Sequence, residues 1–191
     1  FIVVFSITLY VFYTKLKDDR RRAIGIRILS GCWLVSAIIH QIATVYNGVV
    51  VFQVPGMSWA NLLPYTYCSF LSFATPIVLL CCKKDNIALH CLLYFCFFGG
   101  CSSIAAPWLN NPDLPFFSLE IVSALIHHSF MLGMSILLIV IKYIKPRMQR
   151  LWVYPVGVGL ILLLGVFEKY VLKNRATASD VRTIPRIKNI I

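Results

Sequence analysis

Long apolar stretches alternate with short polar connections along the chain. The hydrocarbon core of a bilayer is about 30 Å thick, so a helix needs roughly 20 apolar residues to cross it. Five stretches meet this criterion and predict complete spans, at residues 24–46, 62–82, 87–106, 117–141 and 151–172. A shorter stretch at residues 1–14 predicts a partial span. The expected fold is all-α, a polytopic transmembrane helical bundle with six helices seen, the first of them partial.

The composition supports a membrane protein and excludes other classes. Hydrophobic residues make up 59% of the 191 residues and charged residues only 13%, whereas soluble domains contain about 25% charged residues. The net charge of +11 comes from short basic clusters between apolar runs, which build no continuous basic face for a nucleic acid. We expect one transmembrane domain over residues 1–172 and a basic tail over residues 173–191.

The basic residues also predict how the helices are oriented. Lys and Arg number five in the connection 15–22, two in 83–86 and four in 142–150, but none in 47–61 or 107–116. By the positive-inside rule, the three basic connections are cytosolic and the two uncharged ones face the lumen or the exterior. We call that second side the outer side.

The tail conflicts with this orientation, because it should lie outside and yet holds six basic residues from Lys169 onward. Either the last apolar run does not cross fully, or a seventh helix follows in the intact protein and the tail is truncated or altered. We expect the second. The chain starts at Phe1 and its first methionine is Met57, which predicts a fragment or a processed form.

Neither a disulfide scaffold nor a bound cofactor is indicated. The seven cysteines are an odd number and lie mostly inside apolar runs, which argues against a disulfide framework. No CxxC pairs with another CxxC, so no zinc site is predicted. Glycine-rich phosphate loops, GxSxG and HExxH are also absent from the sequence. We therefore expect no cofactor and no metal.

Polar residues inside the predicted spans mark a candidate site, because they are costly in a bilayer and usually face the bundle interior. Spacings of three and four residues place each set on one helix face. The sets are Ser36, His40, Thr44 and Asn47 in the second helix, Cys68, Ser72 and Thr75 in the third, and Glu120, Ser123 and His127 in the fifth. His128 is turned by about 100° from His127.

These sets are predicted to meet in the outer half of the membrane. Cys68 and His40 each lie about six residues, ~9 Å, from the outer end of their helix. His127 and His128 lie about 10 or 11 residues, ~15 Å, from the outer end of theirs. Allowing one helical turn, the thiol and the imidazoles come within reach of one another if their helices pack together. His90 starts its helix from the cytosolic side and belongs to another environment.

A thiol beside an imidazole can perform acyl transfer. The imidazole takes the thiol proton, and the thiolate attacks an ester carbonyl and holds the acyl group as a thioester. A second hydroxyl, or water, then receives the acyl group. Asn61, Tyr65 or Ser72 could donate to the developing oxyanion, and Asp113 or Glu120 could orient the imidazole.

The chain also resembles a known family. The run Leu63-Pro64-Tyr65-Thr66-Tyr67-Cys68 resembles the Leu-Pro-x-x-x-Cys signature of bacterial YwaF-type membrane proteins and of the transmembrane protein 164 acyltransferase family. Other segments follow in the family's order over roughly residues 20–170. They are Trp59-Ala60-Asn61, the helix from Tyr94 to Gly100, the loop Asn111-Pro112-Asp113-Leu114, and His127-His128.

The resemblance implies a bundle of six or seven helices that moves a polyunsaturated fatty acyl chain between phospholipids. The family cysteine corresponds to Cys68. The family histidine corresponds to His128, since the residue before it matches a polar position, with His127 left open. We expect phospholipid and lysophospholipid to contact five residues, His40, Asn61, Tyr65, Ser72 and Glu120. The chain departs from the family in having two histidines, in a small insertion around Trp108, and from Asn174 onward.

Other interpretations of these cysteine and histidine residues remain open. A buried Cys can be an apolar filler, and a membrane His can simply bind a neighbouring helix. His40, Glu120, His127 and His128 could form the polar path of a transporter or channel. His40 with His127 or His128 could instead ligate a haem or metal in an oxidoreductase. The expected location is multi-pass in an endomembrane, endoplasmic reticulum or Golgi, for a eukaryotic protein, and in the inner or plasma membrane for a bacterial one.

Overall fold

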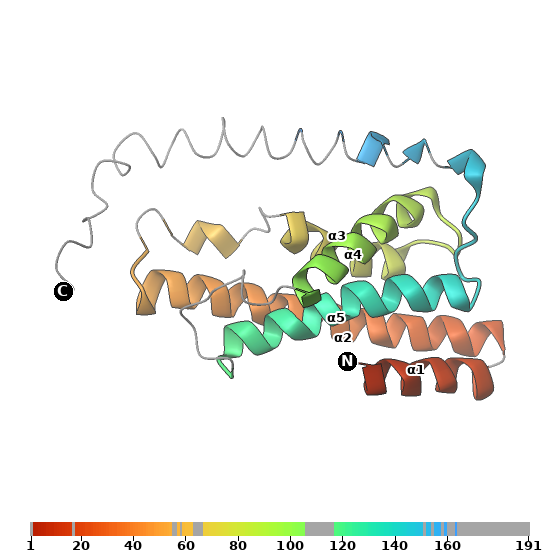
Figure 1. Ribbon diagram of the computed structural model, residues 1–191, viewed down its shortest axis with the longest axis horizontal. Helices are drawn as coiled ribbons and strands as arrows, with labels where there is room; N and C mark the ends of the chain where they lie inside the picture. Colours follow the sequence, from red (N-terminus) through yellow and green to blue (C-terminus); the bar gives the residue numbers. More distant parts are fainter. Residues whose placement is uncertain are drawn as a thin grey trace.

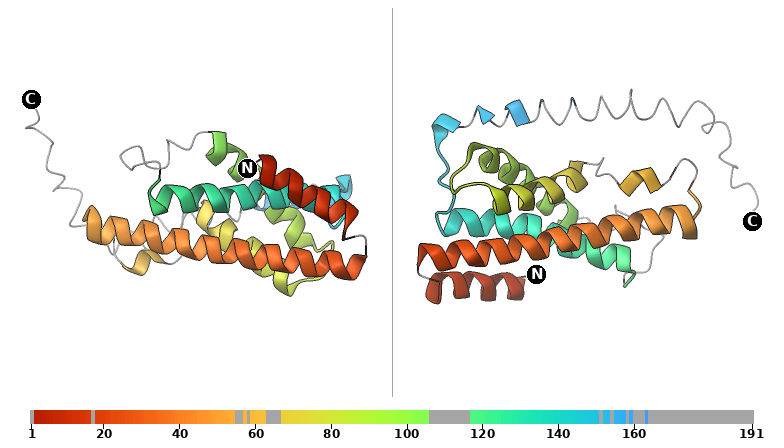
Figure 2. Two further views of the ribbon diagram at one scale, coloured as in Figure 1. Left: turned by 90° about the horizontal axis from the view of Figure 1, so that it is seen from below. Right: turned by 180° about the vertical axis from the view of Figure 1, so that it is seen from behind.

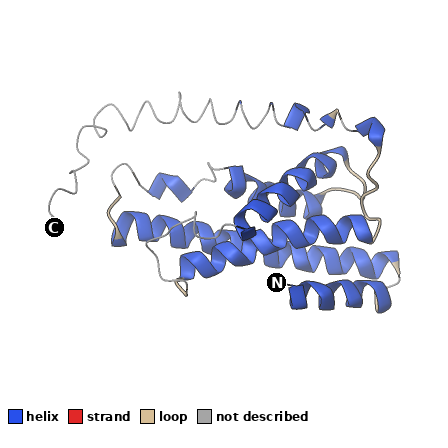
Figure 3. Ribbon diagram, in the orientation of Figure 1, coloured by secondary structure: helices blue, strands red, loops and turns tan. Residues whose placement is uncertain are grey.

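The structure of the protein is entirely helical in the part of the chain that it describes (Figures 1 and 3). This computed structural model describes residues 2–16, 18–54, 57, 59–62, 67–105, 117–150, 152–153, 155–157, 159 and 163. Its α-helices are α1 (Ile2–Thr14), α2 (Asp19–Tyr46), α3 (Tyr67–Cys81), α4 (Ile87–Ala105) and α5 (Leu119–Val140). Beyond α5, residues 153, 155–157, 159 and 163 are also helical, in a sixth helical region of the described residues. The all-α prediction with six helices is confirmed.

Four of these helices form a ring. α2 packs against α3 and α5, and α4 packs against the same two helices, so α2 and α4 occupy opposite corners. α1 folds back along the start of α2 (Figure 2). Phe12 of α1 packs there against Gly25 of α2. Large buried side chains fill the ring, among them Trp33, Leu71, Leu89, Met131 and Leu137. Side chains from all four helices therefore meet in one interior.

Capping explains where two of the helices begin. The side chain of Asp18 accepts a hydrogen bond from the backbone N–H of Arg21, and Ser118 does the same for Ile121. α2 begins at Asp19, before the predicted apolar start at residue 24, because its charged first turn is helical too. At the other end α2 continues into a π-helix, η1 (Asn47–Val51).

The third predicted span, 62–82, covers the described helix α3 (Tyr67–Cys81). Just before it in the chain, Trp59–Leu62 form a short 3-10 helix, η2. Residues 63–66, between the two, lie outside the described residues. A proline, Pro76, lies inside α3. Ser72 therefore receives no helical hydrogen bond from residue 76, which bends such a helix.

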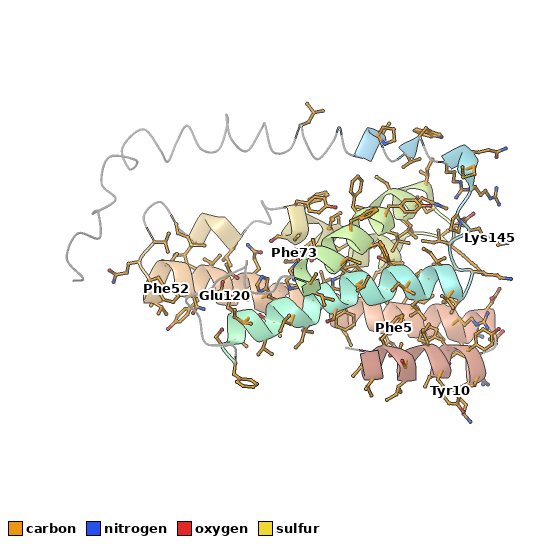
Figure 4. All side chains as sticks on the ribbon, viewed as in Figure 1. Phe5, Tyr10, Phe52, Phe73, Glu120 and Lys145 are labelled. Atoms are coloured by element: carbon orange, nitrogen blue, oxygen red, sulfur yellow. The ribbon has the colours of Figure 1, made fainter. Side chains whose placement is uncertain are left out.

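Three helical segments are long and apolar enough to cross a membrane: Asp19–Val51, Ile87–Ala105 and Leu119–Val140. α1 and α3 are shorter apolar helices. Phe52 and Glu120 lie at one end of the bundle and Lys145 at the opposite end (Figure 4). By the positive-inside rule we expect the Lys145 end on the cytosolic side. Most of the predicted span 151–172 and all of the tail 173–191 lie outside the described residues.

Candidate functional site

Three imidazoles lie one upon the next in the outer half of the ring, with their planes tilted by 31° and 37°. The ring centroids of His40 and His127 are 4.4 Å apart, and those of His127 and His128 are 4.0 Å apart. His127 and His128 are buried, with 2% and 5% of their surface exposed. His40 comes from α2 and the other two from α5, so the cluster joins neighbouring helices of the ring.

Hydrogen bonds to α5 fix which nitrogen of each ring carries the proton. Nδ1–H of His127 donates to the carbonyl of Ser123 at 3.1 Å, and Nδ1–H of His128 donates to the carbonyl of Ala124 at 2.8 Å. Because a carbonyl only accepts, Nε2 of both neutral rings carries a lone pair. Nε2 of His128 is buried and has no hydrogen-bond partner among the described residues. It is therefore available as a base.

A polar stripe continues from the imidazoles to the outer end of the bundle. Nδ1 of His40 lies 3.2 Å from Oγ of Ser123, whose hydroxyl donates to the carbonyl of Glu120 at 3.0 Å. The Glu120 carboxylate accepts a hydrogen bond of 2.7 Å from Nδ2 of Asn47. Glu120 and Asn47 thus tie α5 to α2 near the outer surface, and nothing in the sequence singled out this pairing.

The polar face of α3 points into the same interior. The hydroxyl of Ser72 donates to the sulfur of Met131 at 3.4 Å, and Oγ1 of Thr75 lies 3.1 Å from the sulfur of Cys96. The side chain of Cys68 is hydrogen-bonded to Ser103 of α4. Cys68 is half-buried, whereas Ser72 and Thr75 are fully buried. All three residues of the predicted α3 face therefore contact α4 or α5.

The Ser72–Met131 contact sets the relative height of α3 and α5. Both helices run from the outer side to the cytosolic side. Cys68 precedes Ser72 by one turn, and His128 precedes Met131 by nearly one turn. Cys68 and His128 therefore lie at similar depth, each about 5 Å outward of that contact.

Two glycines of α4 lie beside both of these residues. A Cβ atom on Gly99 would lie 3.9 Å from the sulfur of Cys68. A Cβ atom on Gly100 would lie 3.1 Å from the backbone oxygen of His128 and 2.7 Å from the backbone nitrogen of Leu132. Only glycine allows α4 to approach α5 this closely, because the opposing atoms are backbone and cannot move aside. The Cys68 sulfur thus lies against Gly99, and the backbone carbonyl of His128 lies against the next residue, Gly100.

The other predicted contacts are only partly described. His40, Ser72 and Glu120 lie along the ring interior described above. The side chain of Asn61, and all of Tyr65 and Asp113, lie outside the described residues. Within the described ranges, no group of three or more His, Cys, Asp or Glu residues is arranged to hold a metal ion.

His90 belongs to a separate cluster at the cytosolic end. Its Nε2 lies 2.8 Å from Oδ1 of Asp85, and the guanidinium of Arg150 contacts both residues. Asp85 also accepts a hydrogen bond of 3.1 Å from the backbone N–H of Lys145. Partial desolvation opposes ionisation of Asp85, but the His90 and Lys145 hydrogen bonds and the Arg150 charge outweigh it and hold the pKa of this carboxyl below its usual range. The cluster fastens the α3–α4 turn to the segment after α5.

Long apolar helices and a ring interior with buried polar groups define a multi-pass helical membrane protein. Its family follows from comparison with known proteins. The chain belongs to the TMEM164 family, whose sequence model matches residues 1–180. No curated protein and no solved structure matches the chain.

Proposed function

We propose that this protein is a lipid acyltransferase in which Cys68 carries the acyl group and His128 is the general base. The observation that supports the proposal is that the Cys68 sulfur and the His128 backbone carbonyl lie against adjacent glycines of α4, with the two residues at similar depth. The lone pair on Nε2 of His128 adds to it, because a base needs an unprotonated nitrogen. Membership of the TMEM164 family supports the membrane setting.

In the first half-reaction, Nε2 of His128 takes the proton of the Cys68 thiol. The thiolate attacks the carbonyl carbon of a phospholipid ester, forming an S–C bond. The C–O bond to the glycerol oxygen then breaks, and the imidazolium returns its proton to that oxygen. The products are an acyl-thioester on Cys68 and a lysophospholipid.

The second half-reaction reverses these roles. The hydroxyl of an acceptor lysophospholipid gives its proton to His128, and its oxygen attacks the thioester carbonyl. The S–C bond breaks and the Cys68 thiolate recovers the proton from the imidazolium. No oxidant, metal or cofactor is required by this cycle. Water in place of the acceptor would release a free fatty acid, so hydrolysis is the competing outcome.

His127 and His40 support the base in this proposal. His127 stacks on His128, and His40 stacks on His127. Ser123 holds both of these rings: its carbonyl contacts Nδ1 of His127, and its hydroxyl contacts Nδ1 of His40. Neutral rings stacked in this way restrict the orientation of the His128 ring and keep a second positive charge away from it.

The two alternative functions predict different arrangements. A bis-histidine haem holds its iron and macrocycle between the two ligand rings. The stacked rings of His40, His127 and His128 leave no space for such a plane. A polar path for transport would use the stripe from Asn47 and Glu120 to the imidazoles, and would not require Cys68.

The decisive experiment is capture of the acyl-enzyme. The purified protein is incubated with a defined phospholipid, quenched in acid and digested, and the peptide that contains Cys68 is analysed by mass spectrometry. We expect an acyl adduct on Cys68 that hydroxylamine removes. Cys68→Ala should abolish transfer, with a loss of at least about 10³-fold.

Cys101→Ala is the matched control, because Cys101 is also a half-buried cysteine and lies on α4. This variant should keep both the adduct and the activity. Full transfer activity in Cys68→Ala would overturn the role of Cys68. An unacylated Cys68 in a protein that still transfers acyl chains would do the same.

A further inference from the structure

A recess with several basic side chains opens at the cytosolic end of the bundle, on the opposite side of the membrane from the imidazoles. It has a volume of about 290 Å³ and is formed by the start of α2, the end of α3 and the segment after α5. Its charged lining residues are Arg22, Arg27, Lys83, Lys84 and Asp19. The acyl-transfer proposal makes no use of it.

The charges in the recess are not balanced. Its four cations share one carboxylate, Asp19, which lies 3.6 Å from Nζ of Lys84. Both partners of that ion pair are exposed, with side-chain exposures of 45% and 80%, so the attraction is weak. Like charges gathered around a small volume repel one another, and an anion between them removes this repulsion. The recess is therefore suited to a ligand with more than one negative charge.

Two contacts hold parts of the lining in place. Nε of Arg22 donates a hydrogen bond of 2.6 Å to the carbonyl of Leu16, which fixes the guanidinium at the mouth of the α1–α2 turn. The ammonium of Lys84 lies 5.8 Å from the ring centre of Tyr143, a cation–π distance. Burial raises the pKa of the Tyr143 phenol, although the Arg27 charge opposes this, so the phenol remains a hydrogen-bond donor at neutral pH.

The surroundings of the recess indicate a lipid. On the same turns of α2 that supply Arg22 and Arg27, the side chains of Ile24 and Ile28 are 49% and 61% exposed. An apolar surface thus adjoins the cations, as acyl chains beneath a headgroup require. Basic pockets between helices on the cytosolic side are typical sites for phosphorylated lipid headgroups.

We propose that this recess binds the headgroup of an anionic phospholipid of the cytosolic leaflet that carries a phosphomonoester, such as a phosphoinositide. A phosphomonoester carries about −1.5 to −2 charges at neutral pH, against a single charge on an ordinary phosphodiester. The planar guanidinium groups of Arg22 and Arg27 can each donate two hydrogen bonds to phosphate oxygens. The ammonium groups of Lys83 and Lys84 add positive charge. This site does not depend on the acyl-transfer proposal, since the two lie at opposite ends of the bundle.

Lipid retention tests the site. The intact protein is reconstituted in phosphatidylcholine nanodiscs doped with either phosphatidylinositol 4-phosphate or phosphatidylserine, and bound lipid is measured by native mass spectrometry. The wild type should retain the phosphoinositide and not phosphatidylserine. Arg27→Gln/Lys83→Gln should lower retention by about tenfold or more.

Arg20→Gln/Arg21→Gln is the matched control. It removes the same charge from exposed residues of α2 that do not line the recess, and should change retention less than about twofold. Equal losses in the two double variants would show that general surface charge, and no specific site, holds the lipid. Equal retention of phosphatidylserine would also overturn the proposal. Binding of soluble inositol phosphate as tight as that of the lipid would assign the recess to a free anion instead.

Discussion

Gly100 of α4 lies directly against the backbone of Leu132 in α5, at a distance that excludes a Cβ atom. The neighbouring backbone oxygen belongs to His128. The distance between α4 and α5 therefore depends on the absence of one side chain. This contact lies beside the proposed base, so packing and chemistry are linked at Gly100.

Gly100→Ala should push α4 away from α5. We expect a stability loss of about 1–3 kcal/mol from overpacking against backbone, together with a marked loss of acyl transfer because His128 shifts relative to Cys68. Thermal unfolding in detergent and a transfer assay measure the two effects. Gly31→Ala is the control, since a Cβ there meets nothing within 4 Å. It should be neutral, or stabilising by up to about 1 kcal/mol. Equal effects of the two substitutions would contradict the close-packing argument.

Replacing the two adjacent histidines separately should distinguish their roles. His128→Gln removes the proposed base and should slow thioester formation by about 10²–10⁴-fold. His127→Gln removes a stacked neighbour and should slow it much less. Quenched-flow measurement of the Cys68 adduct separates this step from product release. A larger loss in His127→Gln would show that His127, and not His128, is the base. If neither variant lost activity, an imidazole would not be the base at all.

Asp85 predicts a pH-dependent contribution to stability at the cytosolic end. Its pKa is held below the unfolded value, which is about 3.9. The stabilisation is therefore complete above about pH 4 and is lost as the pH falls through the lower, folded pKa. At pH 7, Asp85→Asn should cost about 1 kcal/mol or more through weaker hydrogen bonds to His90 and Lys145.

The difference in melting temperature between wild type and Asp85→Asn should then shrink when the pH falls below about 4. Asparagine suits this test because it tolerates the left-handed φ of 57° found at Asp85. Asp19→Asn is the control: its ion pair is exposed, and its removal should cost less than about 0.5 kcal/mol. A melting difference that stays constant through acid would refute the role of the Asp85 charge.

The helices were predictable because apolar length is a strong signal in a bilayer protein. The predicted spans 87–106 and 117–141 match α4 and α5 to within two residues at each end. A boundary failed where another effect decided it, as at Asp19, where capping starts α2 within a charged turn. Hydropathy does not register capping.

The sequence predicted which face of each helix carries the candidate site, but not which side chains contact one another there. Periodicity placed Cys68, Ser72 and Thr75 on one side of their helix, and each contacts α4 or α5. The partners on the other helices, such as Asn47 for Glu120 and Ser103 for Cys68, depend on how far each helix rotates and slides. A single sequence contains no information on that rotation. For the same reason the approach at Gly100 could not be foreseen.

The helical segment Asp19–Val51 has 33 residues and is about 50 Å long at about 1.5 Å per residue. Even at the steepest usual tilt of about 40°, a hydrocarbon layer of about 30 Å takes up only about 40 Å of such a rod. The rest of the helix must lie among the headgroups or beyond them, and the length outside the hydrocarbon layer changes with the thickness of the membrane. A thin reticular membrane and a thick, sterol-rich one would hold His40 at different heights relative to the lipid esters. Membrane thickness would thus set the height of the imidazoles relative to the headgroups.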